Sequence, residues 1–371
     1  MKLEEVNPYF GKRVVVSTRG ETRYEGVLEK IDNDPQHVYL QPVVTGAEPT
    51  PYRMHGPGAR THAIPLNEIR AVRPASRVAG TITIGGDLTL HRMGYGAMRL
   101  TGPGIWGWPS DRENALRVLR RAVELGVNFI DTADAYGPDI NEEEIAAALH
   151  PYRNGLVIAT KGGNTRPGPG KWVPDCRPER LKQCCEASLR RLKLDRIDLY
   201  QLHTVDPNVP FEEQVGALRD LRNEGKIRHV GLSNVTFDEL RAGEKIVPIV
   251  SVQNRYNMMY RGGDNERIID YCEERGMAFL PWFPLGAGDN EITDNTEAQI
   301  VAKAHGVRVP QIALAWLLHR SRCVLPIPGT ASIEHLEENI AAANVDLSDD
   351  DLVRLGLRQS ASTHHGAHDE R

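Results

Sequence analysis

The sequence predicts an α/β protein, a (β/α)8 barrel of the TIM type with a small all-β domain in front of it. From about Arg77 onward, short apolar runs alternate with amphipathic helical stretches, which is typical of βα units around a parallel sheet. Eight such units in about 280 residues match the size of a (β/α)8 barrel. A doubly wound sheet is the rival, but no G-x-G-x-x-G motif follows the first strand, so we favour the barrel.

Composition places the chain among ordinary folded proteins. Of 371 residues, 40% are hydrophobic and 26% charged, and the net charge of −5 gives no general attraction to nucleic acid or to an anionic membrane. No apolar run approaches the roughly 18 residues of a membrane span, and the N-terminus lacks the apolar core of a signal peptide. Five cysteines without a C-x-x-C motif argue against a disulfide framework or a zinc ribbon, so we expect a cytoplasmic protein.

Residues 1–77 are predicted to form a small β-barrel. Turn residues separate short β-rich runs, which are Arg13–Thr18, Arg23–Ile31, His37–Val43 and Thr61–Pro74. The stretch from Gly11 to Leu40 resembles the first half of an Sm-like (SH3-type) barrel, although Ala71 stands where that family usually has Gly. Sm-like barrels bind RNA, but 11 Lys and Arg against 9 Asp and Glu leave this segment only two positive charges in excess. We therefore expect oligomerisation or a partner contact and keep RNA binding as the alternative.

Residues 78–357 are predicted to hold the barrel, and residues 358–371 a flexible tail. A hairpin over 81–90 comes first, and strands then end at Gly96, Asp131, Lys161, His203, Ser233, Gln253, Phe283 and Ile327. Helices are predicted over 111–125, 141–149, 178–192, 211–224, 236–245, 264–275, 310–320 and 332–343. The glycines of 162–170 miss the spacing of a phosphate-binding loop, so a plain loop is expected there. The histidines of the tail, His364, His365 and His368, are interpreted as solvated, and no metal site is predicted.

Four reactive side chains follow neighbouring strands at the end where such barrels carry their active sites. Asp131, Lys161 and His203 end strands 2, 3 and 4, and Tyr136 lies in the loop after strand 2. Asp131 and Lys161 both follow apolar strands, and pairing lets both stay charged when desolvated. An ammonium group beside Tyr136 lowers a phenol pKa that starts near ~10, so this tyrosine can exchange a proton with a carbonyl oxygen. This set suits reversible proton transfer beside a hydride donor; a purely structural ion pair is the alternative.

Several motifs taken together carry a family resemblance. NFIDTADAYG, IATKGG, LYQLHTVDP, GLSNV and SVQNRYN resemble, in this order, the aldo/keto reductases over the stretch from Thr81 to Leu357. The resemblance implies an NADP-dependent oxidoreductase that reduces a small carbonyl compound and uses Asp131, Tyr136, Lys161 and His203 as its catalytic tetrad. It also implies NADPH bound across the barrel mouth without a Rossmann motif, with NADH left open.

The same resemblance implies a set of cofactor contacts. Ser233, Asn234 and Gln253 are expected to bond the nicotinamide carboxamide, and Trp282 to stack on its ring. Helix capping by Ser233 and Asn234, and core packing of Trp282, are the alternatives. The pyrophosphate and the adenosine phosphate are assigned to a further set, namely Leu285, Gly286, Gly329, Thr330, His335 and Asn339. Many relatives have Lys and Arg at the positions of Gly329 and His335, so NADPH is an expectation from the family.

Three tryptophans in loops after strands 1 and 3 suggest the substrate. Trp106, Trp108 and Trp172 predict a pocket for a flat aromatic carbonyl compound, unless they only anchor their loops. The segments YGPDIN, QNRYN and PGTASIEHLEEN are similar to the bacterial branch that includes pyridoxal reductases. The hypothesis is reduction of pyridoxal or another aromatic aldehyde. Formation of a homo-oligomer through residues 1–77 is a separate prediction. A non-catalytic nucleotide-binding subunit or an RNA-binding scaffold is the alternative, and the complete tetrad argues against it.

Overall fold

The computed structural model of the protein describes residues 80–286 and 291–357, together with the backbone of five strands that precede them. The chain divides into two compact units, Met1–Arg77 and Val78–Arg371. The tail of 358–371, with its histidines, lies outside the described residues.

The first unit contains one antiparallel sheet. Its strands pair in the order β4-β3-β2-β1-β5, with bounds β1 Arg13–Thr18, β2 Arg23–Glu29, β3 His37–Pro42, β4 His62–Pro65 and β5 Ile69–Pro74. These strands lie where the sequence predicts β structure. Closure of the sheet into an Sm-like barrel stays a prediction.

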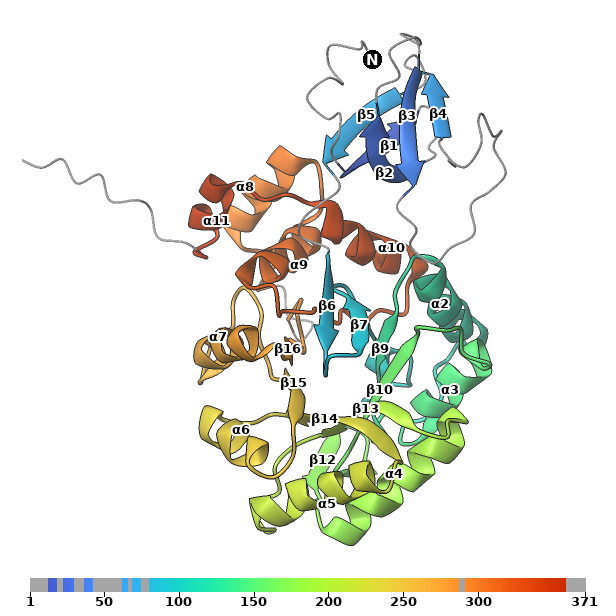
Figure 1. The fold of residues 1–371 in the computed structure, drawn as a ribbon, viewed down its shortest axis with the longest axis vertical. Coiled ribbons are helices and arrows are strands. Elements are labelled where there is room, and N and C mark those ends of the chain that lie inside the picture. Colours follow the sequence, from blue (N-terminus) through green and yellow to red (C-terminus); the bar gives the residue numbers. More distant parts are fainter. Residues whose placement is uncertain are drawn as a thin grey trace, which may run out of the picture. The chain divides into compact units, whose positions relative to one another are not determined.

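The second unit is built around a curled parallel sheet (Figure 1). Seven strands pair in the order β16-β15-β14-β13-β10-β9-β8. Their bounds are β8 Tyr95–Gly96, β9 Phe129–Asp131, β10 Val157–Gly162, β13 Ile197–Leu202, β14 Ile227–Ser233, β15 Ile249–Gln253 and β16 Ala278–Phe279. The predicted parallel α/β architecture is confirmed, and all these strands point their carboxyl ends to the same side.

The segment 323–328 closes the ring between the last strand and the first. On one side Leu325 N donates to Phe279 O at 2.9 Å, and on the other Gly94 N donates to Pro326 O at 2.9 Å. The sequence predicts a strand ending at Ile327, but prolines at 326 and 328 have no N–H, so no continuous ladder forms. The strand predicted to end at Phe283 ends instead at Phe279, because Pro281 interrupts the pairing in the same way.

Helices lie outside the ring of strands (Figure 1). They are α2 Arg112–Glu124, α3 Ile140–Leu149, α4 Pro178–Leu192, α5 Phe211–Asn223, α6 Phe237–Glu244, α7 Asn265–Arg275, α8 Thr296–His305, α9 Val309–Arg320, α10 Ile333–Ala341 and α11 Asp349–Arg354, with 3-10 turns at Ala97–Arg99 and Ala342–Asn344. Eight of them match the predicted helices within a few residues, whereas α8 and α11 were not predicted. None of the helices in the described ranges is long and apolar enough to cross a bilayer.

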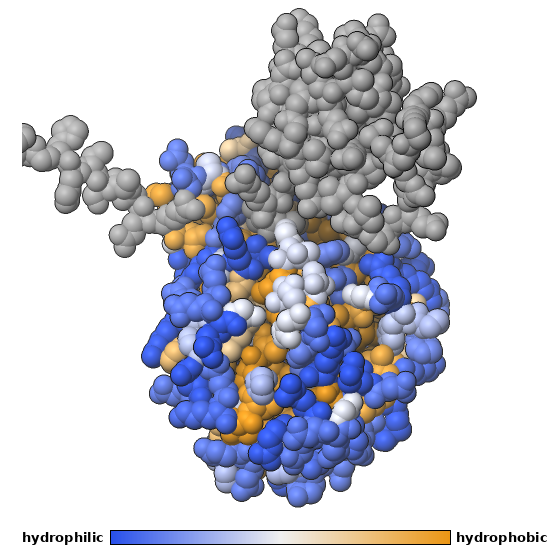
Figure 2. All heavy atoms as spheres, viewed as in Figure 1, coloured by the Kyte–Doolittle hydropathy of each residue, from blue (hydrophilic) through white to orange (hydrophobic). Residues whose placement is uncertain are grey.

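The hairpin of β6 Thr81–Ile84 and β7 Leu88–His91 is present as predicted. Its residues Ile84, Leu88 and Leu90 pack in one buried cluster with Phe129 and Val157, which begin β9 and β10. On the face drawn in Figure 2, hydrophilic residues cover the outer helices and hydrophobic ones gather nearer the middle, where Figure 1 draws this hairpin. The hairpin thus packs at the amino ends of the strands, and the functional side chains lie at their carboxyl ends.

A second hairpin replaces the loop predicted over 162–170, so that prediction is wrong. β11 Asn164–Gly168 and β12 Lys171–Pro174 pair antiparallel, with Thr165 opposite Val173. The Gly- and Pro-rich residues between them form the turn, which is why composition alone indicated a loop.

Close contact between β8 and the closing segment gives a testable prediction about stability. A Cβ added at Gly96 lies 2.6 Å from Ile327 O, which is a backbone atom that cannot turn aside. Gly96→Ala is therefore expected to force the two segments apart and to lower the free energy of unfolding by about 1–3 kcal/mol, measured by urea denaturation.

Gly216→Ala in α5 is the matched control, because the nearest atom to its added Cβ is 3.9 Å away. This substitution is expected to be neutral or mildly stabilising, since it removes backbone freedom from the unfolded chain. Equal unfolding free energies for the two variants contradict the prediction.

Candidate active site

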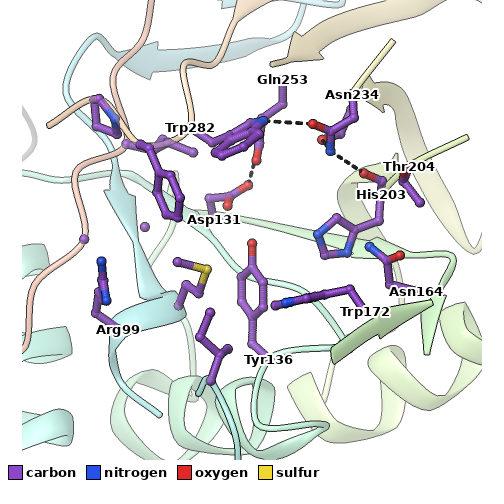
Figure 3. A pocket seen from close by; sticks show the side chains of 18 of the residues that line it. Arg99, Asp131, Tyr136, Asn164, Trp172, His203, Thr204, Asn234, Gln253 and Trp282 are labelled. Carbon is purple, nitrogen blue, oxygen red and sulfur yellow. Dashed lines mark hydrogen bonds between the residues drawn. The ribbon is translucent and has the colours of Figure 1, made fainter. Parts of the chain in front are cut away.

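The structure brings the four predicted catalytic side chains together at the carboxyl ends of β9, β10 and β13. Figure 3 shows Asp131, Tyr136 and His203 at the cavity. Lys161 Nζ lies 2.6 Å from Asp131 Oδ2 and 3.3 Å from the Tyr136 hydroxyl. The ring of His203 lies edge-on to that of Tyr136, with centroids 5.8 Å apart. All four are buried, and the side chain of Lys161 has no exposed surface. A phenol therefore sits against a fully desolvated ammonium group.

Further polar groups complete the ion pair. Lys161 Nζ also donates to the carbonyl of Thr132 at 2.9 Å. The second carboxylate oxygen of Asp131 accepts from Gln253 Nε2 at 2.8 Å and from Gln201 Nε2 at 3.3 Å. Sequence reasoning missed Gln201, although a glutamine within the buried strand IDLYQL is itself a signal of a polar partner inside the barrel.

Burial sets the direction of the pKa shifts. Desolvation alone lowers the pKa of Lys161, but the charge of Asp131 and the Tyr136 hydroxyl outweigh it, so the pKa of this lysine is raised. Desolvation also raises the pKa of Tyr136 above its usual value; Lys161 opposes this rise and Asp131 adds to it. The expectation that the ammonium group gives Tyr136 a lowered pKa is therefore wrong in its net sign, because burial exceeds the effect of one cation.

His203 is a neutral hydrogen-bonding group in this environment. Burial, with Lys161 and Arg166 nearby, holds the pKa of His203 well below its usual range. Its Nδ1 atom is buried and has no hydrogen-bond partner within the described part of the chain. His203 also lines the cavity, where a neutral imidazole can contact the oxygen of a bound molecule.

A cavity of about 640 Å³ opens in front of Tyr136. Several residues predicted to bind a cofactor or a substrate line it, namely Ser233, Asn234, Gln253, Trp282, Leu285, Gly286, Gly329 and Trp172. Several lining residues were not predicted, among them Arg99, Asn164, Thr204 and Phe283. They come from separate parts of the chain, with Asn164 at the start of β11 and Arg99 at the end of a 3-10 turn, and only the folded arrangement brings them to one cavity.

Hydrogen bonds orient the wall that contains Trp282. Trp282 Nε1 donates to Asn234 Oδ1 at 3.0 Å, and Asn234 Nδ2 donates to the carbonyl of His203 at 2.9 Å. Thr236, not Ser233 or Asn234, caps α6, so the capping alternative is wrong. Ser233 and Gln253 line the cavity; within the described residues the Ser233 hydroxyl donates no hydrogen bond and Gln253 Oε1 accepts none, which leaves one donor and one acceptor. A carboxamide offers the complementary pair.

Three predicted cofactor residues lie beyond the cavity wall. Thr330 accepts at its carbonyl from the Tyr95 hydroxyl at 2.6 Å, and its hydroxyl oxygen accepts from Ser332 N at 3.0 Å. The backbone N–H of His335 donates to the Ser332 side chain that caps α10, and the imidazole is exposed. Asn339 is buried in the same helix. These residues stand near Gly329 in the sequence, and their part in cofactor binding stays a prediction.

The three tryptophans do not share one pocket. Trp172, in β12, lines the cavity and lies edge-on to Tyr136 and His203, with ring centroids 6.2 Å and 5.8 Å apart. Trp106 and Trp108 do not line it. Trp106 lies beside the Arg166 guanidinium, and the 45% exposed Trp108 lies under that of Arg112, so both belong to loop packing.

Comparison with known families matches residues 92–356 to the Aldo/keto reductase family. The chain belongs to this family. Its match covers the whole of the curled sheet from β8 to the closing segment and includes every residue of the tetrad.

Named relatives agree with the family. An uncharacterised oxidoreductase of Schizosaccharomyces pombe is 47% identical over 277 residues, which are 75% of this chain and 89% of the relative. Pyridoxine 4-dehydrogenase of Escherichia coli is 41% identical over 283 residues, 75% of this chain and 97% of the relative. Among solved structures, an aldo-keto reductase of Klebsiella pneumoniae in complex with NADPH is similar with a TM-score of 0.63 and 28% identity, covering 75% of this chain and 94% of its own.

The ion pair at the centre of this aldo/keto reductase gives a prediction about stability. Lys161→Met leaves the Asp131 carboxylate buried without its cation, so a loss of about 3–5 kcal/mol in the free energy of unfolding is expected in urea denaturation at pH 7. Lys161→Met combined with Asp131→Asn removes the uncompensated charge, so the double variant is expected to be more stable than the lysine variant.

The control is Lys182→Met, which breaks the half-exposed pair with Asp220. This substitution is expected to lower the free energy of unfolding by about 0–1 kcal/mol, as for other surface ion pairs. A double variant no more stable than Lys161→Met alone contradicts the view that uncompensated charge dominates.

Proposed function

We propose that this aldo/keto reductase catalyses the NAD(P)H-dependent reduction of an aldehyde or ketone to the alcohol, with Tyr136 as the proton donor. The observation that carries the proposal is the Tyr136 hydroxyl, 3.3 Å from the buried Lys161 Nζ at the wall of the cavity. When bound, the reduced nicotinamide supplies a hydride to the carbonyl carbon.

The residues around the cavity fit a nicotinamide. The Ser233 hydroxyl and Gln253 Oε1 offer a donor and an acceptor to its carboxamide, and the oriented indole of Trp282 offers a flat apolar face. Leu285, Gly286 and Gly329 line the cavity, as the family resemblance implies for the phosphate groups. The NADPH complex of the Klebsiella pneumoniae relative supports the same cofactor class. Arg99 is the cation among the residues that line the cavity, and it provides a positive charge for a phosphate group.

The chain's own residues account for the proton transfer. Because the pKa of Tyr136 is raised, the phenol keeps its proton at neutral pH and donates it to the carbonyl oxygen of the substrate. Lys161 stabilises the phenolate that forms, and Asp131 keeps Lys161 charged. The neutral ring of His203 orients the same oxygen through a hydrogen bond.

We propose an aromatic aldehyde such as pyridoxal as the substrate class. Trp172, Tyr136 and His203 form a cluster of three aromatic rings that lines the cavity, which favours a flat ring packed against them. The relative named pyridoxine 4-dehydrogenase supports the same class. The complete tetrad and the cavity in front of it argue against a non-catalytic regulatory subunit.

Tyr136→Phe tests the catalytic assignment. Loss of the hydroxyl removes the proton donor, so kcat for aldehyde reduction is expected to fall about 10²–10⁴-fold, measured from NADPH absorbance. The Kd of NADPH, measured by fluorescence titration, is expected to change less than about twofold, because the groups assigned to the nicotinamide lie on β14 and β15. Retained turnover in this variant overturns the role of Tyr136.

A panel of carbonyl compounds tests the substrate class. The enzyme is expected to oxidise NADPH with pyridoxal or benzaldehydes, and failure with both overturns the aromatic assignment. Trp172→Ala is expected to raise KM for these substrates about 2–10-fold, the value of one aromatic contact, and to leave KM for propanal nearly unchanged. Trp108→Ala, in an exposed loop outside the cavity, is the matched control.

A further inference from the structure

The side chain of Arg166 joins three separate parts of the barrel mouth. It extends from β11 and is 9% exposed. Nε donates to Lys171 O at 2.8 Å, Nη1 to Ala135 O at 2.8 Å and Nη2 to Gly104 O at 2.9 Å. These carbonyls belong to β12, to the loop after β9 and to the loop after β8, so one guanidinium group fixes three segments.

The same guanidinium group lies against the substrate wall. Its central carbon is 3.7 Å from the centroid of the Trp172 ring, and Trp172 in turn lies edge-on to Tyr136 and His203. Ala135, whose carbonyl Arg166 holds, is the residue directly before Tyr136. Arg166 thus stacks on one face of the Trp172 ring and donates a hydrogen bond to the backbone of the loop that contains Tyr136. Arg166 itself does not line the cavity.

The geometry of these contacts requires a planar guanidinium group with several N–H donors. Within the described residues Arg166 forms no ion pair, and its hydrogen bonds all go to neutral backbone carbonyls from three separate segments. Burying a cation costs free energy where no carboxylate neutralises it, so a purely structural link between segments does not account for an arginine here. A lysine ammonium group on a flexible stem cannot reach the same three acceptors and stack on an indole at once.

We propose that Arg166 is a positioning residue for the substrate: it holds the Trp172 indole as a rigid wall beside Tyr136 and His203, and so sets the preference for aromatic over small aliphatic carbonyl compounds. The inference rests on the proposed function, because it concerns the substrate side of the same site. Arg166 acts through Trp172 and through the loop that holds Tyr136.

Kinetics of four variants test the proposal, namely Arg166→Met, Arg166→Lys, Trp172→Ala and the double variant Arg166→Met/Trp172→Ala. The substrates are benzaldehyde and propanal. For Arg166→Met, kcat/KM for benzaldehyde is expected to fall about tenfold or more, with a smaller loss for propanal. Because the two residues act through one wall, the double variant is expected to lose about as much preference as the worse single variant, not the product of both losses. Arg166→Lys keeps the positive charge but not the planar guanidinium group, and it is expected to recover little of the preference for benzaldehyde over propanal.

Arg177→Met is the matched control, because Arg177 follows the same hairpin but is exposed and pairs with Asp175. This variant is expected to keep the wild-type ratio of kcat/KM for benzaldehyde to kcat/KM for propanal. An unchanged ratio in Arg166→Met, multiplicative losses in the double variant, or full rescue by Arg166→Lys each overturn the proposal.

A structural readout separates this inference from the proposed function. Amide hydrogen exchange in 164–174 and 104–107 is expected to accelerate in Arg166→Met and not in Arg177→Met, whether or not a carbonyl substrate is turned over. If the wild type reduces no carbonyl compound, the proposed function fails, and exchange still decides whether Arg166 fixes the hairpin. Unchanged exchange in Arg166→Met overturns the positioning role even in an active enzyme.

Discussion

The buried ion pair of Lys161 and Asp131 is the constraint on which the site depends. Two opposite charges without water are stable only if their remaining hydrogen-bonding capacity is met, and here Thr132 O, Gln201 and Gln253 meet it. These groups come from β9 and the residue after it, β10, β13 and β15, so a closed ring of strands is needed to assemble them. The barrel places the lysine against the phenol of Tyr136, where its charge opposes the rise in pKa that burial, Asp131 and Asp134 cause.

The protonation states follow from the same burial. An apolar surrounding raises the pKa of Tyr136 and lowers that of His203, so the phenol holds a proton and the imidazole is neutral. Lys161 then matters most after the proton has left, because its charge stabilises the phenolate. This order, with a neutral donor at rest and a cation waiting beside it, suits proton transfer to a carbonyl oxygen better than a permanently ionised tyrosine does.

Much of the fold and of the tetrad could be predicted from the sequence, because a polar residue after a short apolar run marks a strand end in a parallel barrel. Asp131 and Lys161 were found in this way. The failures have physical causes. Prolines at 281, 326 and 328 break ladders that apolar patterns indicate, and the hairpin of β11 and β12 is held by the distant contacts of Arg166. The net pKa shift of Tyr136 depends on burial, which no local pattern contains.

The side chains assigned to the cofactor and the side chain assigned to the substrate are held by different kinds of structure. Ser233 and Gln253 end β14 and β15, and their positions are fixed by the ladder of the sheet. Trp172 lies on a hairpin outside that sheet, which the Arg166 side chain and the Gly170 N–H link to the loops after β8 and β9. Changes in the hairpin can therefore reshape the substrate wall without moving the ion pair, whereas a change in the strands moves both. In the function proposed above, the proton transfer thus belongs to the sheet, and the contacts that choose the carbonyl compound belong to what is packed onto it.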